Sequence, residues 1–314
     1  MLMESAVSAD LRAIRKEMTR QESEMRNLLR TNTWRPLCDI AVDWILILAA
    51  VWIFHHGSAW LLPLALLLVG SRGRSLGNIL HDAAHRNLSR NPRLNDAIAQ
   101  LTICPLLLTD LALYREAHHR HHRYLGEPGR DPDLIQPAGD PSRPWVVTYL
   151  ATLLQPRNWW SALSGNLSAR VPPGRLAGQL LWWVVLLGLM GAAGGWRLAG
   201  SFVLLWFAGS ATAFHALTVF RELCDHFGLR PGGIFSYTRD IDTTSPLRWL
   251  VHPRNDGFHL THHLMPAVPY YRLPRAHALF RDTAVYRRHA CICDGYFIGT
   301  GAVISSGPAM QPAV

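Results

Sequence analysis

The sequence predicts an all-α integral membrane protein with four transmembrane helices in two hairpins, covered by a cytosolic helical cap. Three observations support this prediction. First, 49% of the 314 residues are hydrophobic and only 17% are charged, a low charged fraction for a soluble protein. Second, four apolar stretches are long enough to cross a bilayer with modest extension. Third, arginines are distributed unevenly between those stretches, as in membrane proteins of fixed orientation.

The four apolar stretches lie at residues 37–54, 60–77, 176–193 and 198–220. The turn at 55–59 contains no Lys or Arg, and the turn at 191–198 contains only Arg197. Every other connection is rich in arginine, so the positive-inside rule places those connections and both termini in the cytoplasm. Lys16 is the only lysine, and this bias toward arginine indicates a GC-rich bacterial genome. We therefore expect an integral protein of the bacterial inner membrane.

The segment before the first span, residues 1–36, is expected to contain an amphipathic helix at 8–30. Leu11, Ile14, Met18 and Met25 fall near one face of it. This helix either belongs to the soluble cap or lies on the bilayer surface, and the sequence leaves both interpretations open.

Two further apolar segments are expected to be re-entrant or interfacial. Residues 94–113 contain Asp96, Pro105 and Asp110, and a full crossing would place an arginine-rich loop outside the cell. Residues 145–160 contain Pro156 and several tryptophans and are expected to be interfacial.

The predicted membrane domain is residues 37–280. The cytosolic cap would then consist of residues 78–175 and 221–280. Residues 281–314 are polar and rich in small residues, and they are expected to form a loose C-terminal tail.

The net charge of +9 bears on possible partners. Beside long apolar runs, this charge favours anionic lipid headgroups or an acidic redox partner over nucleic acid. The five cysteines form no CxxC pair, and Cys291 and Cys293 make only an isolated CxC. We expect no disulfide framework.

Histidine is the residue type that points to chemistry. Nine of the 16 histidines form a pattern of one HxxxH motif, two HxxHH motifs and one separate histidine. In chain order they are His81 and His85 in HDAAH, His118, His121 and His122 in HHRHH, His226 in RELCDHFG, and His259, His262 and His263 in HLTHH.

The spacing of these motifs predicts a metal centre. Residues three or four apart lie on one face of a helix, so each motif directs its imidazoles to one side. All nine follow cytoplasmic ends of spans or lie on cytoplasmic segments. Because one zinc takes about four ligands, nine imidazoles imply two metals with open positions. The sequence therefore predicts a histidine-rich dinuclear site in the cap, with no catalytic residues beyond the metal ligands.

Ligand type alone leaves the metal open among Zn, Fe, Cu and Ni. No HExxH motif of a metalloprotease occurs. A di-iron carboxylate bundle requires two Glu-x-x-His motifs, and this chain has one, Glu116 to His119.

The motifs HDAAH, HHRHH followed by DPD, and HLTHH resemble the three histidine boxes of the membrane fatty acid desaturase superfamily. That superfamily contains acyl desaturases, hydroxylases, carotenoid ketolases and alkane monooxygenases. The resemblance extends from about residue 76 to residue 277. The stretch DHFGLR is similar to the sequence around an extra histidine ligand in alkane monooxygenases.

The resemblance implies two Fe ions that activate O2 as co-substrate and oxidise unactivated C–H bonds of a lipid-like substrate. It also implies a separate electron donor of the ferredoxin, rubredoxin or cytochrome b5 type, because no fused carrier is visible. One departure concerns Glu222, which stands where stearoyl-CoA desaturases have an Asn. Glu222 would ligate iron directly, ligate it through water, or orient a neighbour.

Other polar residues are expected to support the ligands or the substrate cavity. Candidates for hydrogen bonds to ligating histidines are Asp82, Asp225, Asn255, Asp131 and Asp133. For Asp131 and Asp133, turn formation around Pro132 is an equal alternative. His215 lies inside the fourth span and would either line the substrate cavity or bridge helices. His119, His252, His277 and His289 are expected to be surface or structural residues.

The function predicted from this resemblance is fatty acyl desaturation. A hydroxylase or ketolase of a lipid, carotenoid or specialised metabolite is the alternative. A membrane zinc hydrolase is a distant alternative, disfavoured by the number of histidines. A metal transporter would require histidines within the spans, where only His215 lies.

Overall fold

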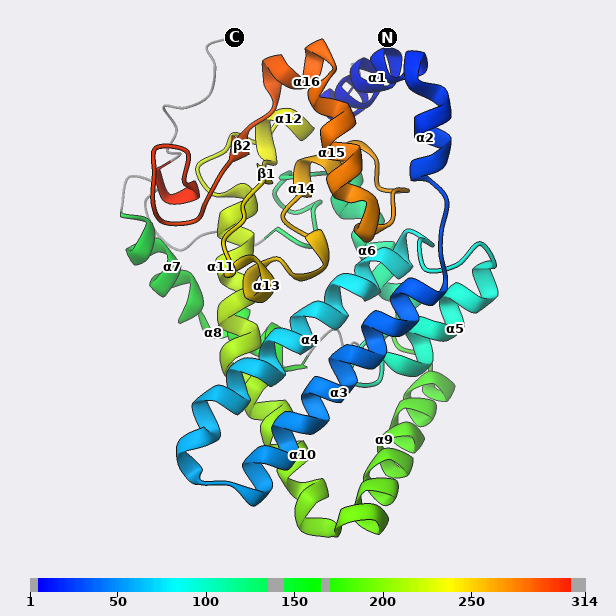
Figure 1. Cartoon of the computed structure of the whole chain (residues 1–314), viewed down its shortest axis with the longest axis vertical. Helices are drawn as coiled ribbons and strands as arrows, with labels where there is room; N and C mark the ends of the chain where they lie inside the picture. Colours follow the sequence, from blue (N-terminus) through cyan, green and yellow to red (C-terminus); the bar gives the residue numbers. More distant parts are fainter. Residues whose placement is uncertain (1–4, 135–143, 165–169, 306–314) are drawn as a thin grey trace. The chain divides into compact units, whose positions relative to one another are not determined.

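The computed structural model describes residues 5–134, 144–164 and 170–305, and nearly all of its regular structure is helical. The chain forms two compact units, and each is described by itself (Figure 1). Unit 1 contains residues 1–31, 116–151 and 220–314, and unit 2 contains residues 32–115 and 152–219.

Unit 2 contains the long apolar helices. Its helices are α3 (Trp34–His56), η2 (Ala59–Leu61), α4 (Leu62–Ala84), α5 (Pro92–Thr102), α8 (Pro156–Ser164), α9 (Pro173–Gly194), α10 (Trp196–Gly209) and the π-helical turn η3 (Ser210–Phe214). Two helices continue from unit 2 into unit 1: α6 (Leu111–Arg123) and α11 (His215–His226). The α3–α4 turn and the α9–α10 turn lie at the same end of unit 2, as expected for two hairpins (Figure 1).

Within the described residues, three helices are long and apolar enough to cross a membrane. They are Trp34–His56, Pro173–Gly194 and the continuous helix Trp196–His226, with mean hydropathies of 2.2, 1.8 and 1.6. They contain the first, third and fourth predicted spans. The second predicted span, 60–77, falls on η2 and α4. Helix α4 is not one of these three long apolar helices. Helix α4 carries Arg72 and Arg74 and continues into the polar HDAAH motif.

The charges on α4 are matched within unit 2. Arg72 Nη1 lies 3.1 Å from the buried Asp43 carboxylate of α3, and Ser75 donates a 2.7 Å hydrogen bond to the same carboxylate. Gly70 permits close packing on the η3 turn, because a Cβ there would lie 2.6 Å from the Phe214 backbone nitrogen. Polar pairing and close backbone contact therefore hold α4 among the apolar helices.

The segment after α5 is irregular and buried, with Ile103, Cys104 and Leu106 fully inaccessible. Side chains of the long helices satisfy its carbonyl groups. The donors are Trp182 to Leu101, Trp44 to Thr102, Trp183 to Pro105, Trp206 to Leu106 and Gln179 to Thr109, at 2.6–3.1 Å. Irregular backbone at membrane depth is tolerated only when it is buried in protein with its polar groups paired. Helix α5 has only 11 residues, so it is shorter than a transmembrane span, and the re-entrant or interfacial placement of residues 94–113 stays a prediction.

Unit 1 is built from short elements around an apolar core. They are α1 (Ala6–Met18), η1 (Thr19–Gln21), α2 (Glu22–Leu28), α7 (Trp145–Leu153, of which residues to 151 belong to unit 1), α12 (Ile234–Tyr237), β1 (Asp240–Ile241), α13 (Arg248–Val251), η4 (Pro253–Asn255), α14 (His259–Leu264), η5 (Tyr270–Arg272), α15 (Leu273–Arg281), α16 (Ala284–His289), β2 (Ile292–Cys293) and η6 (Val303–Ser305). Strands β1 and β2 pair in parallel, Asp240 opposite Ile292.

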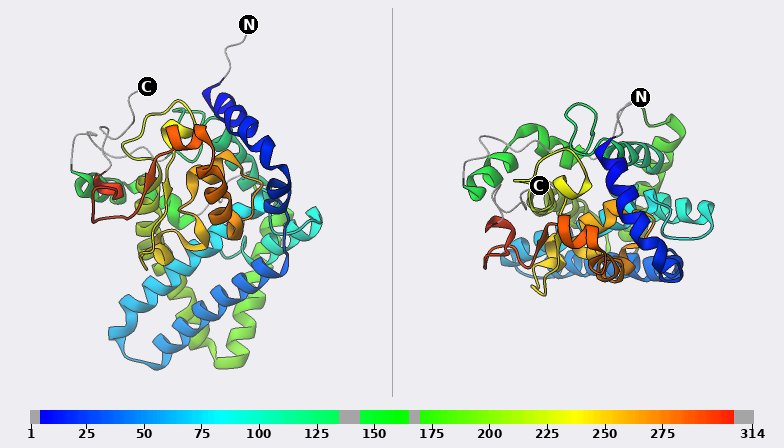
Figure 2. Two further views of the ribbon diagram at one scale, coloured as in Figure 1. Left: turned by 45° about the horizontal axis from the view of Figure 1, so that its top comes forward. Right: turned by 90° about the horizontal axis from the view of Figure 1, so that it is seen from above.

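The N-terminal amphipathic helix belongs to unit 1. Ile14 and Met18 of α1 are each 2% exposed in the core with residues of α12, α14 and α16. Figure 2 shows α1 running beside these elements. The carboxylate of Asp10 accepts hydrogen bonds from the backbone amides of Ile234 and Phe235 at 2.6 and 3.2 Å. The contacts favour the interpretation of α1 as a helix of the cap.

The two units do not follow the predicted domain boundaries, and the cap at 78–175 and 221–280 stays a prediction. Residues 78–115 and 152–175 belong to unit 2, whereas residues 1–31 belong to unit 1. The expected loose tail from residue 281 is folded as far as Ser305. It contributes the fully buried Tyr286 to the core and a strand that pairs with β1, contacts that composition does not reveal.

Candidate metal centre

Helix α14 presents three imidazoles from one short, buried element. His259, His262 and His263 are all at most 5% exposed. Their i, i+3 and i+4 spacing puts them on one side of the helix. The backbone amide and hydroxyl of Thr261 both donate to the buried Asp240 carboxylate of β1, at 2.9 and 2.5 Å. Helix α14 is therefore anchored to the core on the face opposite to an imidazole cluster.

Helix α6 supplies the second set from the same unit. His118 and His121 are buried and His122 is partly buried, whereas His119 is exposed. His226 extends from the last residue of α11. Seven of the nine predicted ligands therefore lie in unit 1, and their rings are close together.

The seven imidazoles form two groups, which we call group A and group B. In group A, the Nε2 atoms of His118 and His122 are 3.0 Å apart, and those of His122 and His262 are 3.1 Å apart. In group B, the Nε2 atoms of His226 and His259 are 3.1 Å apart, and those of His259 and His263 are 3.2 Å apart.

His121 also belongs to group B, because it, His259 and His263 each place a ligating nitrogen within 4.8 Å of the others. The two groups adjoin each other where the rings of His122 and His263 stack with centroids 4.2 Å apart. Two metals side by side would fit this arrangement.

The hydrogen bonds of the Nδ1 atoms show why the converging Nε2 atoms can bind metal. His121 Nδ1–H donates to the Asp131 carboxylate at 2.9 Å, and His226 Nδ1–H donates to the Tyr237 carbonyl at 2.8 Å. A neutral imidazole that donates through Nδ1 carries its lone pair on Nε2. Nε2 lone pairs that face one another at about 3 Å repel each other unless a cation lies between them. These residues therefore fit metal ions.

The turn that follows α6 is shaped to return Asp131 to His121. Gly126 has φ +73°, and a Cβ there would lie 2.6 Å from the Tyr237 ring. The Gly126 amide donates to Asp131 at 2.9 Å, and the Asp133 amide donates to it at 3.0 Å. Asp131 thus forms the turn and also holds the His121 ring, so its contacts fit both roles proposed for it. Asp133 lies 3.5 Å from His118 Nδ1.

The electrostatics keep most of these histidines neutral. Burial lowers the pKa of His226 to about 4 and that of His262 to about 3. Burial also lowers the pKa values of His118, His259 and His263. Burial acts in the same direction on His121, but the Asp131 hydrogen bond and nearby carboxylates outweigh it and raise its pKa. Metal ligation requires neutral imidazole, which this environment favours.

Glu222 is held by an arginine. Its carboxylate pairs with Arg221, and its nearest approach to His226 Nε2 is 4.0 Å. Arg221 also lies 2.8 Å from Asp225 and 3.5 Å from Asp256. Glu222 therefore lies beside the site with its carboxylate paired to Arg221, and this geometry is compatible with each of the three roles proposed for it.

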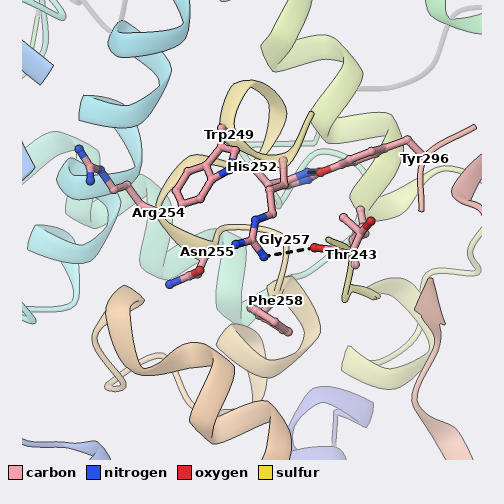
Figure 3. A pocket seen from close by; sticks show the side chains of 10 residues that line it. Thr243, Trp249, His252, Arg254, Asn255, Gly257, Phe258 and Tyr296 are labelled. Carbon is pink, nitrogen blue, oxygen red and sulfur yellow. Dashed lines mark hydrogen bonds between the residues drawn. The ribbon is translucent and has the colours of Figure 1, made fainter. Parts of the chain in front are cut away.

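Asp225 connects the site to a histidine that the sequence analysis placed among structural residues. His252 is buried and lies 3.1 Å from Asp225 through Nε2 and 2.9 Å from the Tyr296 hydroxyl through Nδ1. Asp225 is in turn 3.9 Å from His259 Nδ1. Figure 3 shows the His252 ring facing Tyr296 beside a small pocket of about 20 Å³.

A second buried histidine, His277, supports α14 through the Asp240 carboxylate. His277 Nδ1–H donates to Asp240 at 2.7 Å, and Tyr286 donates to the same carboxylate. His252 and His277 therefore act as structural residues, as the sequence analysis expected. Their partners Tyr286 and Tyr296 come from the segment expected to be a loose tail, so no sequence signal identified them.

The remaining candidates lie elsewhere. Asn255 lines the small pocket and donates to the Tyr270 carbonyl at 3.1 Å (Figure 3). In unit 2, Asp82 accepts from Asn87 at 3.2 Å. His215 lies 2.9 Å from the Leu153 carbonyl through Nε2, a contact that bridges helices.

His81 and His85 lie at the end of α4 in unit 2, with ring centroids 5.3 Å apart. Arg115 holds this helix end. It donates to the carbonyls of Ala83 and Ala84 at 3.1 and 3.0 Å, and it pairs with Asp96 at 2.6 Å. Asn95 adds a 3.0 Å hydrogen bond to Ala83. Arg115 therefore braces the end of the helix that carries the HDAAH motif.

An apolar cavity of about 410 Å³ reaches the metal-binding residues within unit 1. Its lining contains His122 of group A and His263 of group B, together with side chains of α1 and α2. Most ligand pockets have volumes of about 300–1,000 Å³ and largely apolar linings.

Comparisons with known proteins agree on one family. Residues 58–294 match the family model described as fatty acid desaturase. The dihydrorhizobitoxine desaturase of Bradyrhizobium elkanii is 28% identical over 95% of this chain and 87% of that protein. The β-carotene 4-ketolase 3 of Haematococcus lacustris is 24% identical over 63% of this chain and 57% of that protein. The zeaxanthin 4-ketolase of Chlamydomonas reinhardtii is 27% identical over 65% of this chain and 41% of that protein.

Proposed function

The chain belongs to the fatty acid desaturase family, and on that premise we propose that it is a membrane-bound, di-iron, O2-dependent oxidoreductase. Its proposed reaction is desaturation of an acyl chain, with oxidation of unactivated C–H bonds of a lipid-like substrate as the broader class. The observation that carries the proposal is the convergence of seven imidazoles into two adjoining groups.

Iron is the proposed metal because the donors are all nitrogen and because the family reaction oxidises C–H bonds. When bound, two irons supply O2 activation and the oxidising power that removes hydrogen from carbon. One ion would be held by group A, which consists of His118, His122 and His262. The other ion would be held by group B, which consists of His121, His226, His259 and His263. His81 and His85 are added to the ligand set as a proposal from the spacing of their HxxxH motif alone.

The chain's own residues orient and protect the site. Asp131 and the Tyr237 carbonyl fix two imidazoles by hydrogen bonds to Nδ1, which sets the ring plane and the tautomer. Burial of α14 keeps bulk water away from its three ligands. A hydrocarbon chain could then lie beside the metals without competition from solvent.

The remaining parts of the proposal concern the surroundings. The arginine-rich connections are assigned to the cytoplasm, with both termini and the metal centre there, in a bacterial inner membrane. A separate ferredoxin, rubredoxin or cytochrome b5 type protein, with its reductase, is proposed to deliver electrons. The +9 net charge suits an acidic donor.

Ketolation or hydroxylation is the second candidate. Several relatives are named as carotenoid ketolases, whereas the relative that matches 95% of this chain is named as a desaturase. Both reactions begin with hydrogen removal from carbon, and they differ in whether oxygen is retained in the product.

The metal content of detergent-purified protein tests the proposal. We expect about two irons per chain in the wild type and a loss of iron in the His118→Ala/His262→Ala variant. His119→Ala is the matched control, because His119 is exposed on the same helix. A single zinc per chain that iron does not displace would contradict the proposal and favour a hydrolase.

Turnover under ¹⁸O2 then separates the two reactions. In desaturation, the substrate loses two hydrogens, and two electrons and two protons from the donor side complete the reduction of O2 to water. The alkene product therefore carries no label. A labelled alcohol or ketone would identify a hydroxylase or ketolase instead.

A further inference from the structure

The cavity beside the metal-binding residues is a chamber within unit 1, closed on one side by the N-terminal helices. Leu11, Ile14 and Met18 of α1 and Met25 of α2 form that wall. Leu264 and Met265, at the end of α14, face them. Methionine adapts to irregular apolar ligands, so this lining suits a flexible hydrocarbon chain.

The chamber ends at both metal groups. His122 and His263 line it, and their stacked rings mark the point where groups A and B adjoin. An apolar chain in this cavity would therefore have one of its carbons beside the dinuclear site. Because both histidines are proposed metal ligands, the cavity lies next to the site of the proposed reaction.

Arg15 is the one permanently charged side chain among the residues that line the cavity. It lies on α1 with its side chain exposed, and within the described part of the chain it forms no ion pair. A guanidinium at the rim of an apolar chamber suits a carboxylate, which it can bind through two parallel hydrogen bonds.

The cavity volume of about 410 Å³ lies within the usual range for ligand pockets, about 300–1,000 Å³. A free carboxylic acid of medium chain length would fit a pocket of this kind. A carrier-bound acyl group has a neutral thioester or ester at the same position, so an anionic partner for Arg15 would have to come from a phosphate of the carrier.

We propose that this chamber is the substrate site and that it takes a compact, largely apolar molecule as the free carboxylate, with its anionic end at Arg15. The α1–α2 pair is then a wall of the substrate site. This inference rests on the proposed function, because it identifies the class of substrate for the same metal centre.

Binding of radiolabelled dodecanoate to the full-length, iron-loaded protein in detergent tests the proposal by equilibrium dialysis. Dodecanoate is a medium-chain acid with one carboxylate and an apolar tail. Arg15→Met should weaken binding about three- to fivefold, as expected for an ion pair open to solvent. Lys16→Met is the matched control, because Lys16 is exposed on the same helix and does not line the cavity. Unlabelled dodecanol and dodecanoyl-CoA should compete less well than unlabelled dodecanoate.

A second variant tests the chamber itself. Met25→Trp should fill part of the cavity and reduce dodecanoate binding at least tenfold, while octanoate, the shorter acid, should be affected less. Ser23→Trp places the same side chain at an exposed position of α2 and should leave binding unchanged. Unaltered dodecanoate binding in both Arg15→Met and Met25→Trp would overturn the proposal, as would dodecanoyl-CoA competing better than dodecanoate.

The two proposals fail in different ways. A protein that holds about two irons and oxidises other lipids, but does not bind dodecanoate, would refute the substrate site and leave the oxidoreductase. A protein that binds dodecanoate through Arg15 but holds one zinc would refute the oxidoreductase and retain the site.

Discussion

His226 and His259 face each other with their Nε2 atoms 3.1 Å apart, although 33 positions separate them in the chain. His226 is fixed from behind by the Tyr237 carbonyl, and His259 belongs to a helix whose Thr261 is bonded to Asp240. Each imidazole is thus held by backbone or core contacts that do not involve the other. Contacts of this kind set the position of each ring through groups other than its metal-binding nitrogen.

Replacing His226 by alanine should remove about half of the bound iron. His226 belongs to group B, and the three ligands of group A in unit 1 are independent of it. Iron quantification of the purified variant checks this expectation. His289→Ala is the control, because His289 is exposed at the end of α16. Full iron content in His226→Ala would remove His226 from the ligand set.

Asp131→Asn should weaken iron binding about 10- to 100-fold, the usual effect of losing a carboxylate that orients a ligating histidine. The amide can still form part of the turn, but it no longer offers a charged acceptor to His121 Nδ1–H. Competition with a chelator of known affinity measures the change. Glu127→Gln alters a carboxylate of the same turn that pairs with Arg130 and should behave as the wild type.

Metal-free protein should lose stability as the pH falls below about 6.5. The pKa values of His226 and His262 in the fold are about 4 and about 3, and those of His118, His259 and His263 are also lowered. Between these values and about 6.5, the unfolded chain binds more protons than the fold does, so acidification favours unfolding.

His121 acts in the opposite direction, because its raised pKa stabilises the fold at low pH and this contribution is lost as the pH rises through the folded value. Thermal unfolding of the metal-free protein between pH 7.5 and about 5 measures the sum of these opposing contributions to stability. A His226→Gln variant should show a shallower decline. A midpoint that rises on acidification would show that the His121 contribution dominates.

Trp206→Phe should lower the free energy of unfolding by about 1–3 kcal/mol. The indole of Trp206 donates to the Leu106 carbonyl at 3.0 Å in a buried position, and phenylalanine leaves that carbonyl without its donor. Thermal unfolding in detergent reports the loss. Trp196→Phe is the control at an exposed tryptophan of the same helix. Equal midpoints for the two variants would show that the hydrogen bond contributes little.

The candidate metal ligands could be located in the sequence because their spacing carries the information. The pattern of HLTHH is sufficient to place three imidazoles on one side of a helix, and α14 has that form. Likewise, hydropathy identified residues 176–193 as a span because nearly every side chain of α9 is apolar. These are local properties, which depend only on residues within a few turns.

The supporting residues could not be recognised in this way. His252 reaches Asp225 over 27 positions, and its other partner, Tyr296, comes from a segment whose composition suggested a loose tail. Arg115 lies three residues before the second histidine motif, yet its hydrogen bonds go to the end of α4, about 30 positions earlier in the chain. Long-range pairs of this kind leave no periodic signal in the sequence.

By itself, the sequence determined the helical, membrane-type character of the chain, the identity of the histidine motifs and the family to which they belong. Tertiary structure alone decided that α1 packs into unit 1, that Asp131 turns back to His121, and that an apolar chamber reaches His122 and His263. Periodicity and hydropathy follow from neighbouring residues, whereas cavities and hydrogen-bond networks form only when distant segments pack together.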